Sequence, residues 1–281
     1  MPYQISSEKD SLCRAKLFFK GFETSKEKRK NRMSIAATVI TKNEAAFIRA
    51  CLDSLTWADE IIVVDSGSTD GTVEICREYT DKIMLTDWPG PGAQRNRAAA
   101  MATSDWILAM DADEYVPPAL RDEMLAAMAN PGDRVAFRMP RLSSYCGRYM
   151  RHSGWWPDYI TRLYRKDRGR FNAELLHDHM IVDGPVGRLK NHLMHEAFED
   201  LEDVLQKINH YSSDGAVVMR GRGRRAGLST ALLHGFWSFL STYVLRAGFL
   251  DGKEGLMLAI SNAEGTYYKY LKLMLLADKK K

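Results

Sequence analysis

The sequence has few cysteines, and none of them stands in a paired arrangement. Its four cysteines, Cys13, Cys51, Cys76 and Cys146, are scattered over 281 residues without C-x-x-C spacing. Structural zinc sites and disulfide frameworks need closely spaced or matched cysteines. The N-terminus also lacks the apolar stretch and small-residue cleavage site of a signal peptide. We therefore expect a cytoplasmic protein with neither a structural zinc nor a disulfide framework.

Histidines are also few, and no two of them form an H-E-x-x-H arrangement. Four of the seven lie late in the chain, at His177, His179, His192 and His195, and no cysteine accompanies them. A lone histidine is more often packed or hydrogen-bonded than bound to a metal. Packing or hydrogen bonding is therefore the expected role, with metal ligation at His195 as the alternative.

The net charge of +4 is small, but the basic residues are clustered. One cluster lies in residues 1–32, which we interpret as a basic leader, and the other comprises Arg220, Arg222, Arg224 and Arg225. Such clusters suit phosphate-rich surfaces. No nucleic-acid-reading element accompanies them, so an anionic membrane is the expected partner and nucleic acid is not.

A long uncharged stretch follows the second cluster. Residues 226–245 contain no Asp, Glu, Lys or Arg, and this length approaches a bilayer span. Serine, threonine and histidine interrupt the stretch, which favours a helix lying in the membrane interface, with a spanning or a buried helix as alternatives. We expect residues 201–281 to form a helical, membrane-associating region. An apolar stripe from Leu201 to Tyr211 predicts its first helix.

Apolar strands and amphipathic helices alternate in the first half of the chain. Runs at 35–40, 60–65 and 107–111 read as buried strands, and helical patterns separate them. This alternation predicts an α/β fold with right-handed βαβ units. Ligands bind beyond the carboxyl ends of such strands. Four polar residues follow those ends: Thr41, Asn43, Asp65 and Asp111.

The third apolar run ends in Asp111-Ala112-Asp113-Glu114. Side chains two apart on a strand share a face, so Asp111 and Asp113 would repel one another unless a cation or protons neutralised them. Magnesium-like ions take one or two carboxylates together with substrate phosphates. The alternative is an acidic turn that caps the next helix.

A Gly/Pro loop at 88–93 precedes Arg95 and Arg97 at the start of an alanine-rich helix. Arginines and free backbone N–H groups at a helix N-terminus can bind a pyrophosphate. The alternative is that both arginines only solvate a helix face.

Four segments together resemble the inverting family-2 glycosyltransferases. They are Val39-Ile-Thr-Lys-Asn-Glu44, Val63-Val-Asp-Ser-Gly-Ser-Thr-Asp-Gly-Thr72, Gln94-Arg-Asn96 and Met110-Asp-Ala-Asp-Glu114. The resemblance implies a GT-A fold over residues 33–200: a Rossmann-like, mixed, mostly parallel sheet flanked by helices. Within it, residues 33–115 would bind a nucleotide sugar and residues 116–200 an acceptor.

The resemblance also implies Mg²⁺ or Mn²⁺ and roles for individual residues. Asp113 would be the principal metal ligand, and Asp111 would contact the ribose or the metal. Asp65 would hold the uracil or ribose. Thr41, Asn43 and Glu44 would line the nucleoside pocket.

The second half of this region is rich in aromatic and arginine side chains around Trp155–Arg165. Flat rings stack on sugars, and arginine binds phosphate or carboxylate. We expect Trp156, Asp158 and Arg162 to contact substrate, with ordinary packing as the alternative for the tryptophans.

An inverting transfer needs a carboxylate that takes the proton of the acceptor hydroxyl. Asp178 is the candidate base, because it resembles the acidic position of a His-Glu pair in bacterial relatives that extend lipopolysaccharide cores. This chain has Asp instead of Glu there. Glu174, Glu196 and Asp158 are alternatives, as is a surface acid without a role.

The pattern Tyr243-x-x-x-x-Gly-Phe-x-Asp-Gly252 looks like the tail of the lipopolysaccharide-core β-1,4-glucosyltransferase group. The expected function is transfer of a hexose, glucose from UDP-glucose, to a lipid-linked glycan such as a core heptose. The expected location is the cytoplasmic face of the bacterial inner membrane, as a peripheral protein. The alternatives are a nucleotidyltransferase acting on a sugar phosphate and a non-catalytic, membrane-bound glycan-binding scaffold.

Overall fold

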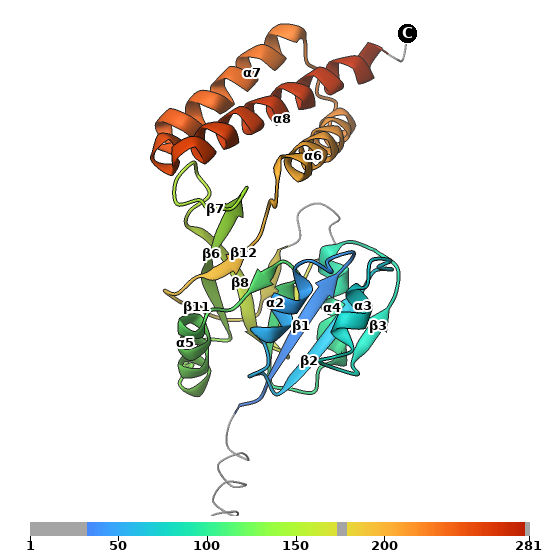
Figure 1. The fold of residues 1–281 in the computed structure, drawn as a ribbon, viewed down its shortest axis with the longest axis vertical. Helices are drawn as coiled ribbons and strands as arrows, with labels where there is room; N and C mark the ends of the chain where they lie inside the picture. Colours follow the sequence, from blue (N-terminus) through green and yellow to red (C-terminus); the bar gives the residue numbers. More distant parts are fainter. Residues whose placement is uncertain (1–32, 173–178, 279–281) are drawn as a thin grey trace, which may run out of the picture.

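The structure is a computed structural model that describes residues 33–172 and 179–278. The expected leader, 1–32, and the candidate base, Asp178, lie outside these residues. Figure 1 shows a sheet with its helices in the lower part of the molecule and a group of long helices above it.

Four parallel strands form one side of the sheet, in the order β3-β2-β1-β4. Their bounds are β1 Ile35–Thr41, β2 Glu60–Asp65, β3 Ile83–Leu85 and β4 Trp106–Asp111. β1 and β4 are buried along nearly their whole length, as their apolar runs predict. The register pairs Thr41 with Asp65 and Ile40 with Asp111, so three predicted polar positions meet at one edge of the sheet.

The sheet continues from β4 through β8, β6, β12 and β5, and β7 and β11 pair with β6. The bounds are β5 Glu114–Tyr115, β6 Ala136–Tyr145, β7 Arg148–Tyr149, β8 Asp158–Arg165, β11 Val186–Arg188 and β12 Leu193–His195. A separate antiparallel pair is formed by β9, Gly169–Phe171, and β10, Met180–Val182. The pairing of β12 with β5 sets His195 opposite Glu114, and thus next to the acidic turn after β4.

Helices cover both faces of the parallel strands. They are α2 Ile48–Asp53, α3 Thr72–Cys76, α4 Pro91–Met101 and α5 Pro118–Ala129. Leu52 of α2 and Leu120 of α5 pack with Val39 in one core. Ala98 of α4 packs with Val64 in a second core on the other side. The predicted mixed, mostly parallel sheet flanked by helices is therefore confirmed.

The C-terminal region is helical, as predicted. It contains α6 Leu201–Gly221, α7 Leu228–Leu240, a π-helical turn at Ser241–Leu245, a 3₁₀ turn at Gly248–Asp251 and α8 Gly252–Asp278. α8 packs against both α6 and α7 (Figure 1). Nζ of Lys272 donates hydrogen bonds of 2.8 Å to the hydroxyls of Ser212 and Ser213 on α6. On the other side, a Cβ at Gly235 of α7 would lie only 3.2 Å from Cβ of Tyr267.

A small apolar cluster joins these helices to the sheet. Val204 of α6 and Leu258 of α8 are buried together with Tyr145 and Met150, which flank β7. The start of α6 is therefore fixed against the segment around Tyr145 and Met150, at the end of β6.

α7 is shorter than the expected 226–245 helix, because a π-helical turn begins at Ser241. Its outer face is apolar and open: Leu233 is 69% exposed and Phe236 is 67% exposed. A buried helix is thereby excluded. Of the helices in the described part of the chain, none has the length and apolar character needed to cross a bilayer, so the spanning alternative is wrong for those residues.

Candidate active site

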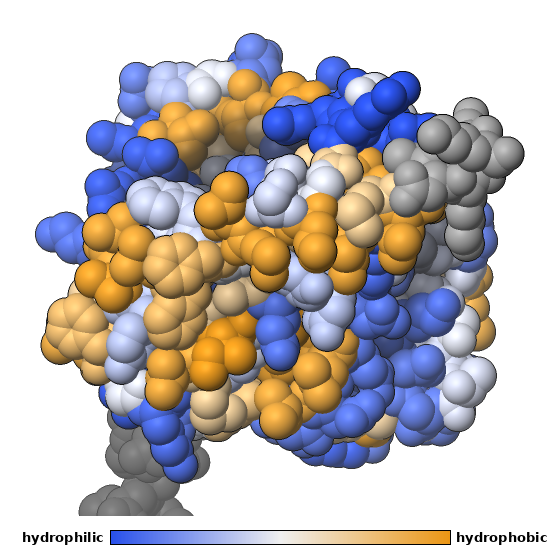
Figure 2. Space-filling model, turned by 90° about the horizontal axis from the view of Figure 1, so that it is seen from above, coloured by the Kyte–Doolittle hydropathy of each residue, from blue (hydrophilic) through white to orange (hydrophobic). Residues whose placement is uncertain are grey.

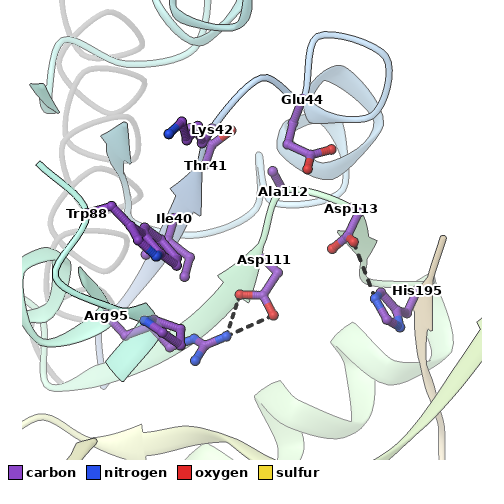
Figure 3. A pocket seen from close by; sticks show the side chains of 11 residues that line it. Ile40, Thr41, Lys42, Glu44, Trp88, Arg95, Asp111, Ala112, Asp113 and His195 are labelled. Atoms are coloured by element: carbon purple, nitrogen blue, oxygen red, sulfur yellow. Dashed lines mark hydrogen bonds and ion pairs between the residues drawn. The ribbon is translucent and has the colours of Figure 1, made fainter. Parts of the chain in front are cut away.

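A cavity of about 280 Å³ opens where β1 and β4 end (Figure 3). Its lining contains five of the predicted site residues: Thr41, Glu44, Arg95, Asp111 and Asp113. The strand register explains this grouping, because parallel strands that end together bring their following loops together.

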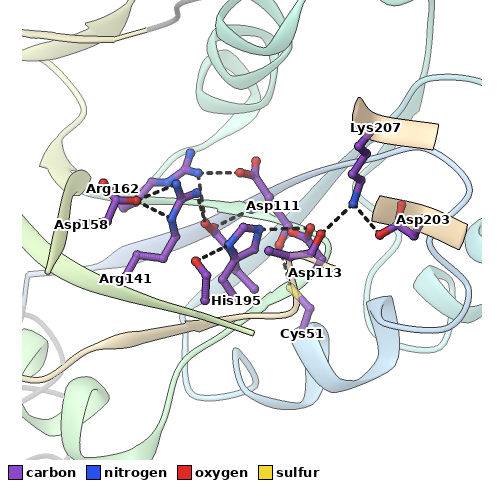
Figure 4. Close-up of polar contacts among 12 residues, drawn as sticks. Cys51, Asp111, Asp113, Arg141, Asp158, Arg162, His195, Asp203 and Lys207 are labelled. Carbon is purple, nitrogen blue, oxygen red and sulfur yellow. Dashed lines mark hydrogen bonds and ion pairs between the residues drawn. The ribbon is translucent and has the colours of Figure 1, made fainter. Parts of the chain in front are cut away.

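Asp111 is held by two guanidinium groups. Its carboxylate accepts a 2.6 Å bond from Nη2 of Arg95 and a 2.5 Å bond from Nη2 of Arg162 (Figures 3 and 4). Burial opposes ionisation of Asp111, but Arg162 and Arg95 outweigh it and hold the pKa of the carboxyl well below its usual range. Arg162 is itself buried and also reaches Glu114, at 3.2 Å. Three predicted site residues thus form one charge-paired cluster under the cavity.

Asp113 faces His195 across the mouth of the cavity. Nε2 of His195 lies 3.3 Å from Oδ2 of Asp113 (Figure 3). Nδ1 of the same ring lies 2.8 Å from the hydroxyl of Ser143. Burial opposes protonation of the ring, but the bond to Asp113 prevails and raises the pKa of His195. The sequence predicted a packed or hydrogen-bonded histidine here, and His195 does contact Ser143 and Asp113. Its place in the lining of the cavity was foreseen only by the alternative of metal ligation.

The residues at this point suit a divalent ion that also binds a diphosphate. The part of the chain that the structure describes holds no cluster of three or more His, Cys, Asp or Glu side chains arranged to hold a metal by themselves. A Mg²⁺-like ion bound with phosphates takes one or two carboxylates from the protein. Asp113 supplies such a carboxylate, and the neutral form of the His195 ring beside it would add a second ligand, whereas Asp111 is already paired with arginine. Asp111 as a metal ligand stays a prediction.

Two further predicted residues in the cavity have unusual environments. Oγ1 of Thr41 is buried and has no hydrogen-bond partner within the described residues. An unpaired buried hydroxyl is costly, so a ligand that supplies a partner would be favoured here. Burial and the nearby charge of Asp113 raise the pKa of Glu44 to about 7. Its side chain is therefore partly protonated near neutral pH.

Asp65 and Asn43 shape the neighbouring loop and do not line the cavity. The carboxylate of Asp65 accepts 2.9 Å bonds from the backbone N–H groups of Gly67 and Ser68, and a short bond from the Ser68 hydroxyl. Oδ1 of Asn43 accepts a 2.8 Å bond from the backbone N–H of Thr69. Their predicted contacts with a nucleoside stay predictions.

A second, larger cavity of about 580 Å³ adjoins the first and shares Glu44, Asp113 and His195 with it. Asp158, another predicted residue, lines this cavity and accepts a 2.7 Å bond from Arg141 (Figure 4). The shared residues place any metal held by Asp113 and His195 at the boundary between the two cavities.

Trp156 is not part of either cavity lining. Its ring packs edge-on against His192, with the guanidinium of Arg151 5.6 Å from the ring centroid. The neighbouring Trp155 lines the second cavity and stacks on Phe198, with ring centroids 5.8 Å apart. The predicted substrate contact of Trp156 stays a prediction, and it is the adjacent Trp155 that lines a cavity.

Helix α6 supplies two cavity residues that the sequence did not single out. Lys207 and Tyr211 both line the second cavity. Tyr211 belongs to the predicted apolar stripe, yet it is 61% exposed. Nζ of Lys207 lies 4.7 Å from the Phe198 ring centroid and 2.9 Å from Oδ2 of Asp203 (Figure 4). The sequence feature that could have indicated Tyr211 as a cavity residue is its hydroxyl group on an otherwise apolar stripe of the helix.

Four acidic residues were considered as the base that deprotonates the acceptor hydroxyl, and the structure describes two of them, Asp158 and Glu196. Asp178 and Glu174 fall outside the described residues. Glu196 accepts a short hydrogen bond from the hydroxyl of Tyr149 and lines neither cavity. Of the two described alternatives, only Asp158 lines the second cavity.

The family of the chain follows from its match to a family model. The Glycosyl transferase family 2 model matches residues 37–189, which is more than half of the sequence, and the chain belongs to this family of glycosyltransferases. The GT-A fold expected from the resemblance agrees with the observed sheet and helices.

Several curated relatives match most of the chain. An uncharacterized glycosyltransferase of Rickettsia prowazekii is 28% identical over 251 residues, which cover 85% of this chain and 86% of the relative. The lipopolysaccharide core biosynthesis glycosyltransferase LpsC of Rhizobium meliloti is 26% identical over 258 residues, covering 85% of this chain and 94% of the relative.

Among solved structures, the chain is similar to S. aureus TarS 1–349 in complex with UDP. The identity is 17% and the TM-score is 0.44, over 89% of this chain and 92% of that chain. In a match to a longer TarS chain, the similarity spans 40% of that chain.

Proposed function

We propose that this glycosyltransferase moves a hexose from a nucleotide sugar, with UDP-glucose as the donor, onto a lipid-linked glycan with inversion at the anomeric carbon. The observation that carries the proposal is the position of Asp113 and His195 between two cavities. A donor in one cavity and an acceptor in the other would meet at this pair.

The smaller cavity is proposed to hold the nucleoside diphosphate. The unpaired Thr41 hydroxyl would bond the nucleoside, and Glu44 would line the same pocket. Arg95 would add positive charge beside the diphosphate while Asp111 holds its guanidinium in place. Asn43 and Asp65 would act through the loop that they fix. The choice of UDP-glucose rests on the resemblance to the lipopolysaccharide-core β-1,4-glucosyltransferase group.

Asp113 and His195 are proposed to hold Mg²⁺ or Mn²⁺, with Asp111 as the further predicted ligand. A bound divalent ion offsets the negative charge that develops on a departing diphosphate. The two side chains come from segments far apart in the sequence, and the Ser143 hydroxyl orients the imidazole through Nδ1.

The larger cavity is proposed to take the acceptor. Trp155 offers an aromatic surface for a sugar ring, and Asp158 and Lys207 offer groups that bond hydroxyls. Trp156 and Arg162, also predicted as substrate contacts, would act by packing and by charge behind the site. Asp178 is proposed as the base that takes the proton of the attacking hydroxyl. The relative's name, lipopolysaccharide core biosynthesis glycosyltransferase, supports a lipopolysaccharide core as acceptor. The choice of a core heptose rests on the resemblance to the lipopolysaccharide-core β-1,4-glucosyltransferase group.

We assign residues 33–115 to donor binding and residues 116–200 to acceptor binding, with residues 201–281 as a helical region that docks on a membrane. The open apolar face of α7 follows the cluster Arg220, Arg222, Arg224 and Arg225. Apolar burial and attraction to anionic lipids act together in such segments. The proposed place of action is the cytoplasmic face of the bacterial inner membrane.

The deciding experiment supplies UDP-glucose, Mn²⁺ and a lipopolysaccharide core acceptor to the purified protein and measures the released product. Transfer releases UDP and places glucose on the acceptor. Release of pyrophosphate from a nucleoside triphosphate and a sugar phosphate would instead establish a nucleotidyltransferase. Binding of acceptor without turnover of any nucleotide sugar would indicate a glycan-binding scaffold.

A further inference from the structure

A third cavity lies in the C-terminal helical region. It is a groove of about 440 Å³ between α7 and α8. Among the described residues, its lining includes three basic side chains, His234, Arg246 and Lys269, and no Asp or Glu. The groove shares no residue with the active-site cavities.

The two strong cations of the groove are available to an anion. Neither Arg246 nor Lys269 forms an ion pair with an acidic side chain within residues 33–172 and 179–278. Nζ of Lys269 lies 5.4 Å from the ring centroid of Tyr270, and His234 stacks on the same ring with centroids 4.3 Å apart. Both basic groups thus contact the same aromatic ring.

Neutral polar groups form the floor of the groove. The hydroxyl of Thr266 lies 3.3 Å from that of Ser238, which in turn donates to the carbonyl oxygen of Asn262 at 3.1 Å. Nδ2 of Asn262 lies 3.4 Å from Oγ1 of Thr242. Two helices that only packed against each other would bury apolar side chains here. Hydroxyl and amide groups next to free cations are the groups that bind phosphate oxygens.

The groove borders the apolar outer face of α7. Leu232, Leu233, Phe236 and Trp237 are each more than half exposed, and Trp237 also lines the groove. Figure 2 shows that hydrophobic side chains dominate this face when the molecule is seen from above. An exposed apolar surface beside the groove would not contribute to binding of a soluble anion. A lipid headgroup, in contrast, lies at the boundary between the apolar and the charged parts of a membrane.

We propose that the α7–α8 groove binds the phosphate of an anionic lipid headgroup while the outer face of α7 enters the bilayer. Arg246 and Lys269 neutralise the phosphate, and the hydroxyls of the floor bond the glycerol part of the headgroup. This inference rests on the proposed contact with a membrane and does not depend on the transfer reaction.

The test measures binding of the full chain to phosphatidylcholine vesicles with and without phosphatidylglycerol, by co-sedimentation. The double variant Arg246→Gln/Lys269→Gln should bind the anionic vesicles about tenfold or more weakly than the wild type. Ser241→Trp fills the groove without removing charge and should weaken binding in the same way. Thermal unfolding by circular dichroism checks that each variant is folded.

Two matched controls separate a site from general attraction. Arg121→Gln/Arg168→Gln removes two exposed charges far from α7 and should bind within about twofold of the wild type. Ser229→Trp adds the same ring on exposed α7 surface outside the groove and should not weaken binding.

Three results would overturn the inference. The first is equal loss in the groove variant and the distant charge control, because diffuse attraction would then suffice. The second is undiminished binding by Ser241→Trp. The third is a groove variant that loses binding of inorganic phosphate in solution but binds anionic vesicles like the wild type, which would assign the groove to a soluble anion. If the wild type ignores anionic vesicles altogether, the membrane contact also fails, whereas transfer to a soluble acceptor would remain as a separate result.

Discussion

Nε2 of His195 lies 3.3 Å from Oδ2 of Asp113, although one residue ends β12 and the other belongs to the turn after β4. The pairing of β12 with β5 sets this distance. An imidazole and a carboxylate so placed can either bond one another or share a cation.

Replacement of Asp113 by Asn should abolish most metal-dependent binding of UDP. An amide is a weaker ligand for a divalent ion than a carboxylate, and we expect affinity to fall by about 10- to 100-fold. Calorimetry of UDP binding with Mn²⁺, repeated with chelator, measures the change. Asp122→Asn on the exposed surface of α5 is the control. Wild-type binding that is indifferent to chelator would refute the metal assignment.

Thr41→Val should weaken UDP binding while leaving the fold at least as stable. The change removes a buried hydroxyl that has no protein partner in the described structure, so unfolding by urea should show no loss. If the hydroxyl bonds the nucleoside, the dissociation constant should rise about tenfold. A variant that binds UDP normally would exclude this contact. Thr38→Val is the comparison, because the Thr38 hydroxyl lies in the same strand and bonds the carbonyl oxygen of Leu108.

Tyr211→Ala should raise the KM for the acceptor and leave UDP binding unchanged. Tyr211 lines only the larger cavity, and loss of one aromatic face costs about 1 kcal/mol, or roughly fivefold in KM. Steady-state kinetics with each substrate varied in turn gives both constants. Leu205→Ala removes another exposed α6 side chain outside the cavity and should change neither. An equal rise in the donor KM would contradict the division between the cavities.

Asp178→Asn should bind UDP normally and lose turnover. A general base contributes about 10²- to 10⁴-fold to a rate, so kcat should fall by that range. Single-turnover transfer measurements separate this loss from any change in binding. Asp158→Asn serves as the competing variant, since Asp158 is the described alternative in the larger cavity. Near-normal turnover by Asp178→Asn would remove Asp178 from the role.

Glu60 should make the folded state sensitive to acid. Burial opposes its ionisation, but bonds from Lys82, Ser104 and the backbone of Thr103 prevail and lower its pKa to about 2. Because the folded-state pKa lies below the ordinary 4.5, this stabilisation is complete above about pH 4.5 and disappears as the pH falls towards 2.

Replacement by glutamine tests this pH dependence. Glu60→Gln should lower the free energy of unfolding by about 2 kcal/mol at pH 7. The difference from the wild type should shrink steadily below pH 4.5. Urea unfolding from pH 7 to pH 3 provides the measurement, and a difference that does not vary with pH would exclude the ionised carboxylate as its source.

The sequence predicted those parts of the site that depend on local patterns. Thr41 and Asp111 end buried parallel strands, and both facts follow from apolar runs and from the polar residues that close them. Parallel strands then bring the two residues together without further information. Arg95, which was predicted from its place near a helix N-terminus, lies beside them and bonds Asp111, and its contact with a pyrophosphate stays a prediction.

Residues brought in by distant packing were harder to predict. His195 reaches the site because β12 pairs with the two-residue strand β5. Neither the amino-acid composition nor the hydrophobic periodicity of these short segments predicts that pairing. Tyr211 reaches it because α6 packs against the sheet through Val204, one turn or more before it. Trp155 and Trp156 are adjacent, and only the Trp155 side chain lines the larger cavity. In an irregular segment the direction of a side chain depends on its tertiary contacts, so the sequence could not distinguish the two.

Helix α6 carries Lys207 in the larger cavity and Arg220 near the start of the apolar face. At about 1.5 Å per residue, the two positions are at most about 20 Å apart along the helix axis. If the outer face of α7 lies in a bilayer, α6 sets the distance between the membrane surface and the larger cavity. The enzyme would then select its acceptor by the distance of the hydroxyl from the membrane as well as by shape. A sugar on a glycan of the matching length would be accepted, whereas the same sugar attached closer to the lipid would not.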